Sequence, residues 1–106
     1  MASIGQVTRR GNGFKGFLKT LSFRANITIV PNPDKTAANQ PDYRVLNEGA
    51  EIGSGWIQRS KSTGNEYVSL SLADPAFGPK TLYANLGRMA GQDDEEVLAV
   101  IWNAKK

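Results

Sequence analysis

The sequence of 106 residues contains no cysteine and no histidine. The absence of cysteine excludes disulfide bonds, thiolate metal sites and a cysteine nucleophile. The absence of histidine removes the commonest general base, the commonest metal ligand and the side chain that titrates near neutral pH. Catalysis would therefore depend on paired carboxylates, a serine–lysine pair or a metal held by oxygen ligands.

The acidic residues do not form such a pattern. Most of them lie singly in predicted turns, and no two have a spacing that local structure would bring together. The run from Asp93 to Glu96 could collect Mg²⁺ weakly, but such a run is usually a solvated turn. The segment from Gly49 to Gly55 has no Gly-Lys-Ser of the kind that binds phosphate. We therefore expect a protein that is not an enzyme and that has no metal and no cofactor.

Long hydrophobic segments are also absent. The longest apolar run is Val97–Trp102, whereas a membrane-spanning helix needs about 18 residues. The N-terminus lacks the apolar core of a signal peptide, because residues 9–13 read Arg-Arg-Gly-Asn-Gly. We expect a cytoplasmic protein with no membrane segment. Its length suits a single domain, residues 1–106.

Basic residues are distributed unevenly, although the formal net charge is only +3. Residues 1–24 contain no acidic side chain and five basic ones, whereas the rest of the chain holds eight basic and ten acidic residues. The five are Arg9, Arg10, Lys15, Lys19 and Arg24. A basic segment of this kind attracts nucleic acid, an anionic membrane surface or an acidic partner. The alternative is a solvated strand face that keeps the protein soluble.

The clearest periodicity is that of a β-strand. From Thr20 to Ile29 every odd position is apolar and every even position is polar, which places the apolar side chains on one face of a sheet. Pro31 ends this strand. Further strands are predicted at residues 4–10, 14–19, 43–46, 51–60, 66–72 and 81–86. Hairpin turns are predicted at residues 11–13 and 61–65, and a polar loop at residues 34–42.

The last apolar run is ambiguous. The acidic residues 93–96 form a good start signal for a helix, but the β-branched and aromatic residues of 97–102 favour a strand. We favour the strand. About seven short strands joined by glycine-rich turns, with no alternating helices, predict an all-β fold, a small antiparallel barrel or sandwich.

Several segments resemble a known family when taken in order. They are Pro41-Asp42-Tyr43-Arg44-Val45, Gly53 with Gly55-Trp56, Tyr67-Val68-Ser69-Leu70 and Tyr83-Ala84-Asn85-Leu86. With them, nearly the whole chain resembles domain-of-unknown-function family 736 (DUF736), short bacterial proteins often encoded on plasmids and integrating elements. The resemblance implies a role connected with a mobile element, and it assigns no catalytic residues.

Aromatic residues near the basic ones point to a binding surface. If Val68, Leu70 and Leu72 face the core, Tyr67 faces outward, and the hairpin brings it near Trp56, Arg59 and Lys61. Trp56, however, shares its parity with Ile52, so both could point into the core. Phe14 and Phe17 have opposite parity. One of the two should therefore be exposed beside Lys15 and Lys19, unless a bulge at Gly16 shifts the register.

These features predict non-enzymatic binding of single-stranded nucleic acid, in an accessory role for a mobile element. Tyr67, with Trp56 or Phe14, would stack on bases, while basic side chains follow the phosphates. The basic side chains are Arg9, Arg10, Lys15, Lys19, Arg24, Arg59 and Lys61. The alternative is a small interaction protein that binds another protein, or itself as a homodimer, through a sheet edge.

Overall fold

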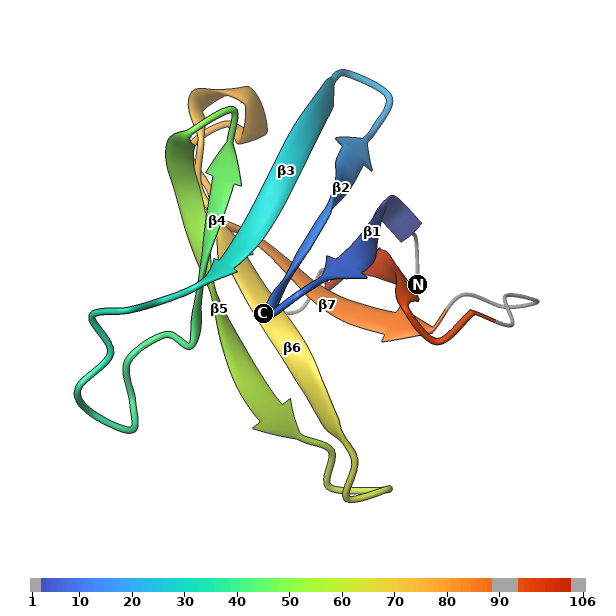
Figure 1. Cartoon of the computed structure of the whole chain (residues 1–106). Coiled ribbons are helices and arrows are strands. Elements are labelled where there is room, and N and C mark those ends of the chain that lie inside the picture. Colours follow the sequence, from blue (N-terminus) through green and yellow to red (C-terminus); the bar gives the residue numbers. More distant parts are fainter. Residues whose placement is uncertain (1–2, 89–93, 104–106) are drawn as a thin grey trace.

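Eight antiparallel β-strands form a closed barrel in which every strand pairs with its neighbours in the sequence (Figure 1). The structure, a computed structural model, describes residues 3–88 and 94–103. The strands are β1 (Ser3–Arg10), β2 (Gly13–Lys19), β3 (Arg24–Pro31), β4 (Tyr43–Asn47), β5 (Ala50–Arg59), β6 (Glu66–Leu72), β7 (Leu82–Arg88) and β8 (Val97–Trp102). The all-β prediction is confirmed, with eight strands where about seven were expected. The last apolar run is a strand, as predicted.

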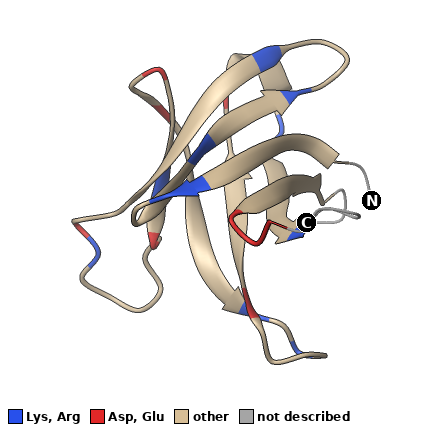
Figure 2. Cartoon of the chain, turned by 45° about the vertical axis from the view of Figure 1, so that its right-hand side comes forward, with Lys and Arg blue, Asp and Glu red and all other residues tan. Residues whose placement is uncertain are grey.

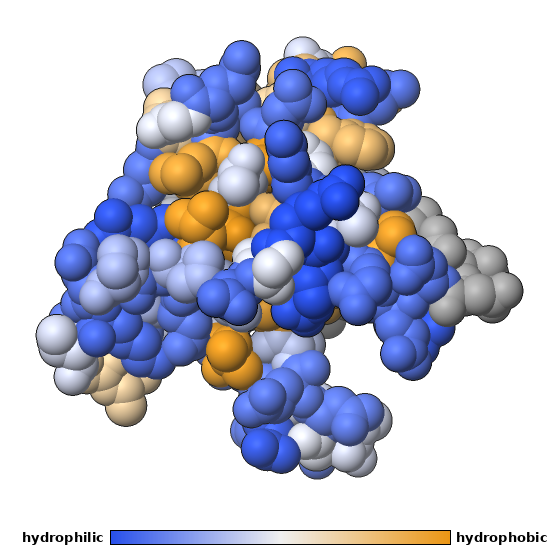
Figure 3. All heavy atoms as spheres, viewed as in Figure 1, coloured by the Kyte–Doolittle hydropathy of each residue, from blue (hydrophilic) through white to orange (hydrophobic). Residues whose placement is uncertain are grey.

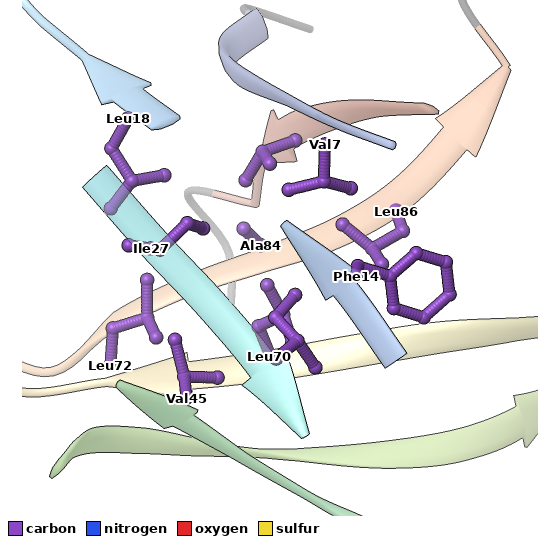
Figure 4. Packing of buried hydrophobic residues seen from close by; sticks show 11 residues of the cluster. Val7, Phe14, Leu18, Ile27, Val45, Leu70, Leu72, Ala84 and Leu86 are labelled. Atoms are coloured by element: carbon purple, nitrogen blue, oxygen red, sulfur yellow. The ribbon is translucent and has the colours of Figure 1, made fainter. Parts of the chain in front are cut away.

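Alternation along the strands fills the barrel with side chains (Figure 4). One set of positions points inward from seven of the strands, and the members of this core are at most 4% exposed. They are Val7, Phe14, Leu18, Ile27, Ile29, Val45, Leu70, Leu72, Ala84, Leu86 and Val100. A small barrel packed in this way leaves its outer surface and its two ends for binding.

Gly16 sets the closest approach of β1 and β2. A Cβ atom at this position would lie 1.9 Å from the carbonyl oxygen of Gln6 and 2.6 Å from the Cα atom of Val7. The pairing of β2 with both neighbours continues through Gly16 without a shift. The bulge considered at this position is therefore absent, and Phe14 and Phe17 lie on opposite faces of β2.

The turn between β2 and β3 corrects the prediction of a strand from Thr20 to Ile29. The backbone N–H of Thr20 donates to the carbonyl oxygen of Phe23 at 2.9 Å, and the Thr20 hydroxyl accepts from the N–H groups of Ser22 and Phe23. These bonds close a turn before β3 begins at Arg24. Leu21, expected on the inner face, is fully exposed at the tip of the turn.

A second correction concerns Trp56, which lies on the outer surface of β5. The register of β4 and β5 shifts between Val45 and Leu46, so that Ile52 is an extra residue on β5. Because this bulge breaks the alternation, Ile52 packs against the core, whereas Trp56 pairs with Ser69 on the opposite face. Shared parity in the sequence is therefore no guide to a shared face here.

Closure of the barrel leaves no free sheet edge among the eight described strands. β1 pairs with β8 from Ser3 to Thr8, so each of the eight described strands has a partner on both sides. The one helical element in the described part of the chain is the three-residue turn η1 (Pro75–Phe77), capped by Asp74. No helix among the described residues has the length and apolar character needed to cross a membrane.

Candidate nucleic-acid interface

The outer surface of β1, β2 and β3 gathers most of the basic side chains of the N-terminal segment. The inward positions of these strands include Val7, Leu18 and Ile27, so the alternate positions point outward. We call the outward side chains of the three strands the basic face. It comprises Arg10, Lys15, Phe17, Lys19 and Arg24 with Gln6, Thr8, Asn26 and Thr28.

Acidic residues are absent from the basic face, because the first acidic residue of the sequence is Asp34. Figure 2 shows Lys and Arg along this side of the barrel, with Asp and Glu on other parts of the chain. Nothing on the three strands therefore offsets the positive charge locally. Such a surface concentrates anions near it.

Strand register spaces the charges of the basic face regularly. Lys15 pairs with Thr8 of β1 and Thr28 of β3, and Lys19 pairs with Arg24. Outward residues on one strand repeat about every 7 Å, so Lys15 and Lys19 stand about 14 Å apart along β2 with Phe17 between them. The arrangement is an elongated positive surface with an aromatic ring at its middle.

The Arg24 guanidinium lies over the ring of Phe17. The guanidinium carbon of Arg24 lies 5.0 Å from the ring centroid, a cation–π contact between neighbouring strands. The Phe17 side chain is half-buried and pairs with polar residues on both sides, Gln6 and Asn26. Ring and guanidinium together offer flat surfaces on which a base can stack.

Arg9 and Phe14, two predicted site residues, lie on the inner side of their strands. Phe14 is 2% exposed and packs in the core, so its ring cannot serve as a stacking surface. The guanidinium of Arg9 covers this ring, 4.7 Å from the centroid, and lies 3.5 Å from the Glu96 carboxylate. The charge of Arg9 is therefore partly neutralised at the end of the barrel.

The predicted cluster around Tyr67 assembles only in part. Trp56 and Tyr67 share the outer surface of β5 and β6, with Gln58 paired to Tyr67. Arg59 alternates with Trp56 and Gln58 along β5 and so belongs to the other face of the strand. Its guanidinium is 3.8 Å from the Glu66 carboxylate and donates to the Gly64 carbonyl oxygen at 2.7 Å. Lys61 is exposed in the hairpin loop. We call the outward side chains of β5 and β6 the second aromatic surface; of its two predicted cations, Arg59 is paired with Glu66.

The loop between β3 and β4 is held against the second aromatic surface. The indole N–H of Trp56 donates to the carbonyl oxygen of Asn39 at 3.3 Å. The Asp42 carboxylate accepts from the backbone N–H of Ile57 at 2.8 Å and from Lys35. These contacts, the Ile57 N–H first, lower the pKa of Asp42 below its ordinary value. The loop is therefore fastened to β5 by an ionised carboxylate.

The acidic run near the C-terminus neutralises basic side chains where it is described. Asp93 lies outside the described residues. Glu96 faces Arg9, and the Glu95 carboxylate lies 3.7 Å from Arg88. Within residues 3–88 and 94–103, no three acidic residues come together in a group that could hold a metal ion.

Phe17 is the site residue that the sequence identified only as one of two choices. Its parity relative to Phe14 carried the signal, and the register of β2 decides between them. The exposure of Leu21 at one end of the barrel was not predictable from the residue pattern, because its alternation with Phe23 is that of a strand.

Comparison with known proteins identifies the family and nothing more specific. Neither the curated proteins nor the solved structures contain a match to this chain. Residues 3–105 match the family model described as "Protein of unknown function (DUF736)". This match covers all eight strands of the barrel, and the chain belongs to the DUF736 family.

Proposed function

We propose that this protein binds single-stranded nucleic acid, without catalysing a reaction, through the basic face of β1–β3. One observation carries the proposal. Lys15, Lys19 and Arg24 lie next to the outward ring of Phe17, and Arg10 lies further along the same face, on strands that have no acidic residue. Cations with an aromatic ring among them are the combination that sequence-tolerant single-strand binders use.

The proposed mechanism divides the work between charge and stacking. Lysine and arginine neutralise phosphates and release counterions, which supplies affinity without sequence preference. Phe17, with Arg24 on its ring, stacks on a base. Bases expose their faces in a single strand and hide them in a duplex, so the aromatic contribution favours single-stranded DNA or RNA. Trp56 lies on β5 and Tyr67 on β6, so neither residue belongs to the basic face.

The proposed cellular setting follows from composition and family. The cysteine-free sequence is consistent with the cytoplasm, where nucleic acids are accessible. The family resemblance supports an accessory role in the replication or transfer of a mobile element.

A fluorescence-anisotropy titration tests the proposal. Labelled single-stranded DNA and RNA oligonucleotides are titrated with the protein at low and at moderate salt. Micromolar or tighter binding that weakens with salt is the expected result. An absence of binding at low salt would overturn the proposal, and the basic face would then be a solvated surface.

A matched pair of charge reversals locates the binding surface. Lys15 on the basic face and Lys61 in the β5–β6 loop are both exposed, so Lys15→Glu and Lys61→Glu change the net charge equally. We expect Lys15→Glu to weaken binding on the order of tenfold and Lys61→Glu to have little effect. An equal loss in both variants would show attraction by overall charge instead of by the basic face.

Protein interaction or self-association is the second candidate, favoured by two exposed apolar side chains. Leu21 is fully exposed and Trp102 is 43% exposed, and both line the same end of the barrel. Sedimentation of the purified chain at high salt tests self-association. A dimer that persists there would favour this candidate, whereas a monomer would leave only binding to a different protein.

A further inference from the structure

One end of the barrel opens into a hollow of about 630 Å³. Hydrophobic side chains reach the surface in several separate places (Figure 3), and two of the exposed large ones, Leu21 and Trp102, lie at this end. The hollow is lined by Ile4, Leu21, Phe23, Phe77, Leu82 and Trp102, together with Lys19. Its volume lies within the range of small-molecule sites.

Hydrogen bonds hold the rim of the hollow in place. The bonds of Thr20 to Ser22 and Phe23 close the β2–β3 turn. The Phe23 ring packs on Phe77 of η1, with centroids 5.2 Å apart. Leu21 consequently stands exposed on a fixed turn, so the rim is preformed.

Trp102 supplies the largest flat surface in the hollow. It is the last residue of β8 and pairs with Ala84, and 43% of it is exposed to solvent. Trp102 also lines an adjoining hollow of about 390 Å³ that includes Lys80. An indole this accessible, in two hollows that are each lined by one lysine, suits a flat apolar ring attached to an anionic group.

Lys19 joins the hollow to the basic face. It is the last residue of β2, where it pairs with Arg24 on the basic face, and it also lines the hollow. A strand whose phosphates follow Lys15 and Lys19 therefore arrives at the rim. Among the described residues that line the hollow, none is acidic, so no lining side chain repels the approaching phosphate.

We propose that the hollow at this end of the barrel accepts one unstacked base of a nucleic-acid strand held on the basic face, with Trp102 as the stacking surface. The inference rests on the proposed function and deepens it. The charges of the basic face would bind any polyanion, whereas only a strand that has bases can place one in the hollow. Affinity for a normal strand should therefore exceed affinity for a strand that lacks bases.

The two tryptophans allow a direct test. Trp56 lies on β5 and Trp102 at the barrel end, so Trp56→Phe leaves Trp102 as the sole indole. The fluorescence of this variant is followed during titration with oligothymidylate, with an abasic strand of equal length and with thymidine monophosphate. Anisotropy of labelled strands measures binding in the same samples. We expect oligothymidylate to quench Trp102 and the abasic strand to bind more weakly without quenching it.

The possible outcomes distinguish the base pocket at Trp102 from strand binding by the basic face. Binding of oligothymidylate without quenching of Trp102, or equal quenching by the abasic strand, would overturn the base pocket and leave the basic face intact. Equal quenching by thymidine monophosphate would show a nucleotide pocket independent of the strand, which also overturns the proposal. No binding in anisotropy would overturn the proposed function, and the base pocket with it.

A second variant measures the contribution of the pocket to affinity. Trp102→Leu removes the indole at a partly exposed strand end, and Tyr67→Leu is the matched control because it removes a half-buried aromatic ring from the outer surface of β6. Affinity for oligothymidylate should fall roughly 5- to 150-fold in Trp102→Leu, the range expected for one base stack. Tyr67→Leu should bind as the parent does. Circular dichroism establishes that both fold, and equal affinities of the two variants would contradict the pocket.

Discussion

The guanidinium of Arg24 lies 5.0 Å from the centroid of the Phe17 ring and joins β3 to β2 on the outer surface of the barrel. The pair sits among Lys15 and Lys19, which flank Phe17 on its own strand. Phe14, three residues earlier, is buried in the core. The alternation of a single strand thus separates an aromatic ring in the core from one on the outer surface.

Replacing Phe17 with leucine tests the stacking role. Phe17→Leu keeps an apolar side chain between the two lysines but loses the flat ring, so affinity for a single strand should fall roughly 5- to 150-fold. Its salt dependence should be unchanged, because the cations remain. Anisotropy titrations at several salt concentrations measure both quantities. An affinity equal to that of the parent protein would show that Phe17 makes no stack.

The salt dependence of the binding constant should report how many phosphates the basic face neutralises. If the four cations of the basic face each contact a phosphate of single-stranded nucleic acid, a plot of the logarithm of the binding constant against the logarithm of salt concentration should have a slope of about −3. The double variant Lys15→Glu/Lys19→Glu should lose measurable binding while its circular dichroism spectrum stays unchanged, because both side chains are exposed. A slope near zero, or full affinity in the double variant, would contradict the assignment of these residues.

The Asp42 carboxylate makes stability depend on pH. Its pKa is lowered in the folded state by the Ile57 N–H and by Lys35, so its contribution is fully present above the ordinary aspartate pKa of about 3.9. The contribution is lost as the pH falls through the lower folded-state value. Asp42→Asn should lower the free energy of unfolding by about 1–2 kcal/mol at pH 7. This difference from the parent protein should shrink below about pH 4. Urea unfolding at pH 7 and pH 3 measures it, and a constant difference would argue against this role.

Gly16 should tolerate no side chain. In Gly16→Ala the new Cβ atom would meet backbone atoms of β1, 1.9 Å from the Gln6 carbonyl oxygen, and relieving that overlap requires the strands to separate. We expect a loss of at least about 2 kcal/mol in the free energy of unfolding. Gly87→Ala is the control, because its Cβ atom would meet only the Cδ1 atom of the flexible Ile101 side chain, at 3.0 Å. Thermal unfolding compares the two, and similar midpoints would contradict the close approach.

Alternation and, at residues 97–102, β-branched and aromatic content were sufficient to predict where most of the strands lie. Ile27 and Ile29 point inward as the period of two predicts, and the apolar run at residues 97–102 is the strand β8. The two-residue loop after β1 was also predictable. Gly11 adopts a φ of 58° there, a conformation that glycine takes up without strain. Barrel closure was not predictable, since it depends on the pairing of β1 with β8, whose residues are far apart in the sequence.

Three side chains lie elsewhere than their sequence pattern predicts, each for a local physical reason. Leu21 continues the alternation of β3, but hydrogen bonds to Thr20 fold its segment into a turn. Trp56 shares parity with Ile52, but one extra residue in β5 turns the two to opposite faces. Arg9 belongs to the basic segment, yet its strand position directs it over Phe14 and toward Glu96. For Leu21 and Trp56 the deciding interaction is hydrogen bonding or strand pairing, which the residue pattern does not encode, whereas Arg9 shares the parity of the inward Val7.

The most direct test of the basic face is a map of the amides that respond to a bound strand. Two-dimensional ¹H–¹⁵N spectra of the labelled protein are recorded during titration with oligothymidylate at low salt. We expect the largest shift changes on β1–β3, at Lys15, Phe17, Lys19 and Arg24, and their reversal when salt is added. Changes confined to the β5–β6 hairpin, or no changes at all, would contradict the account.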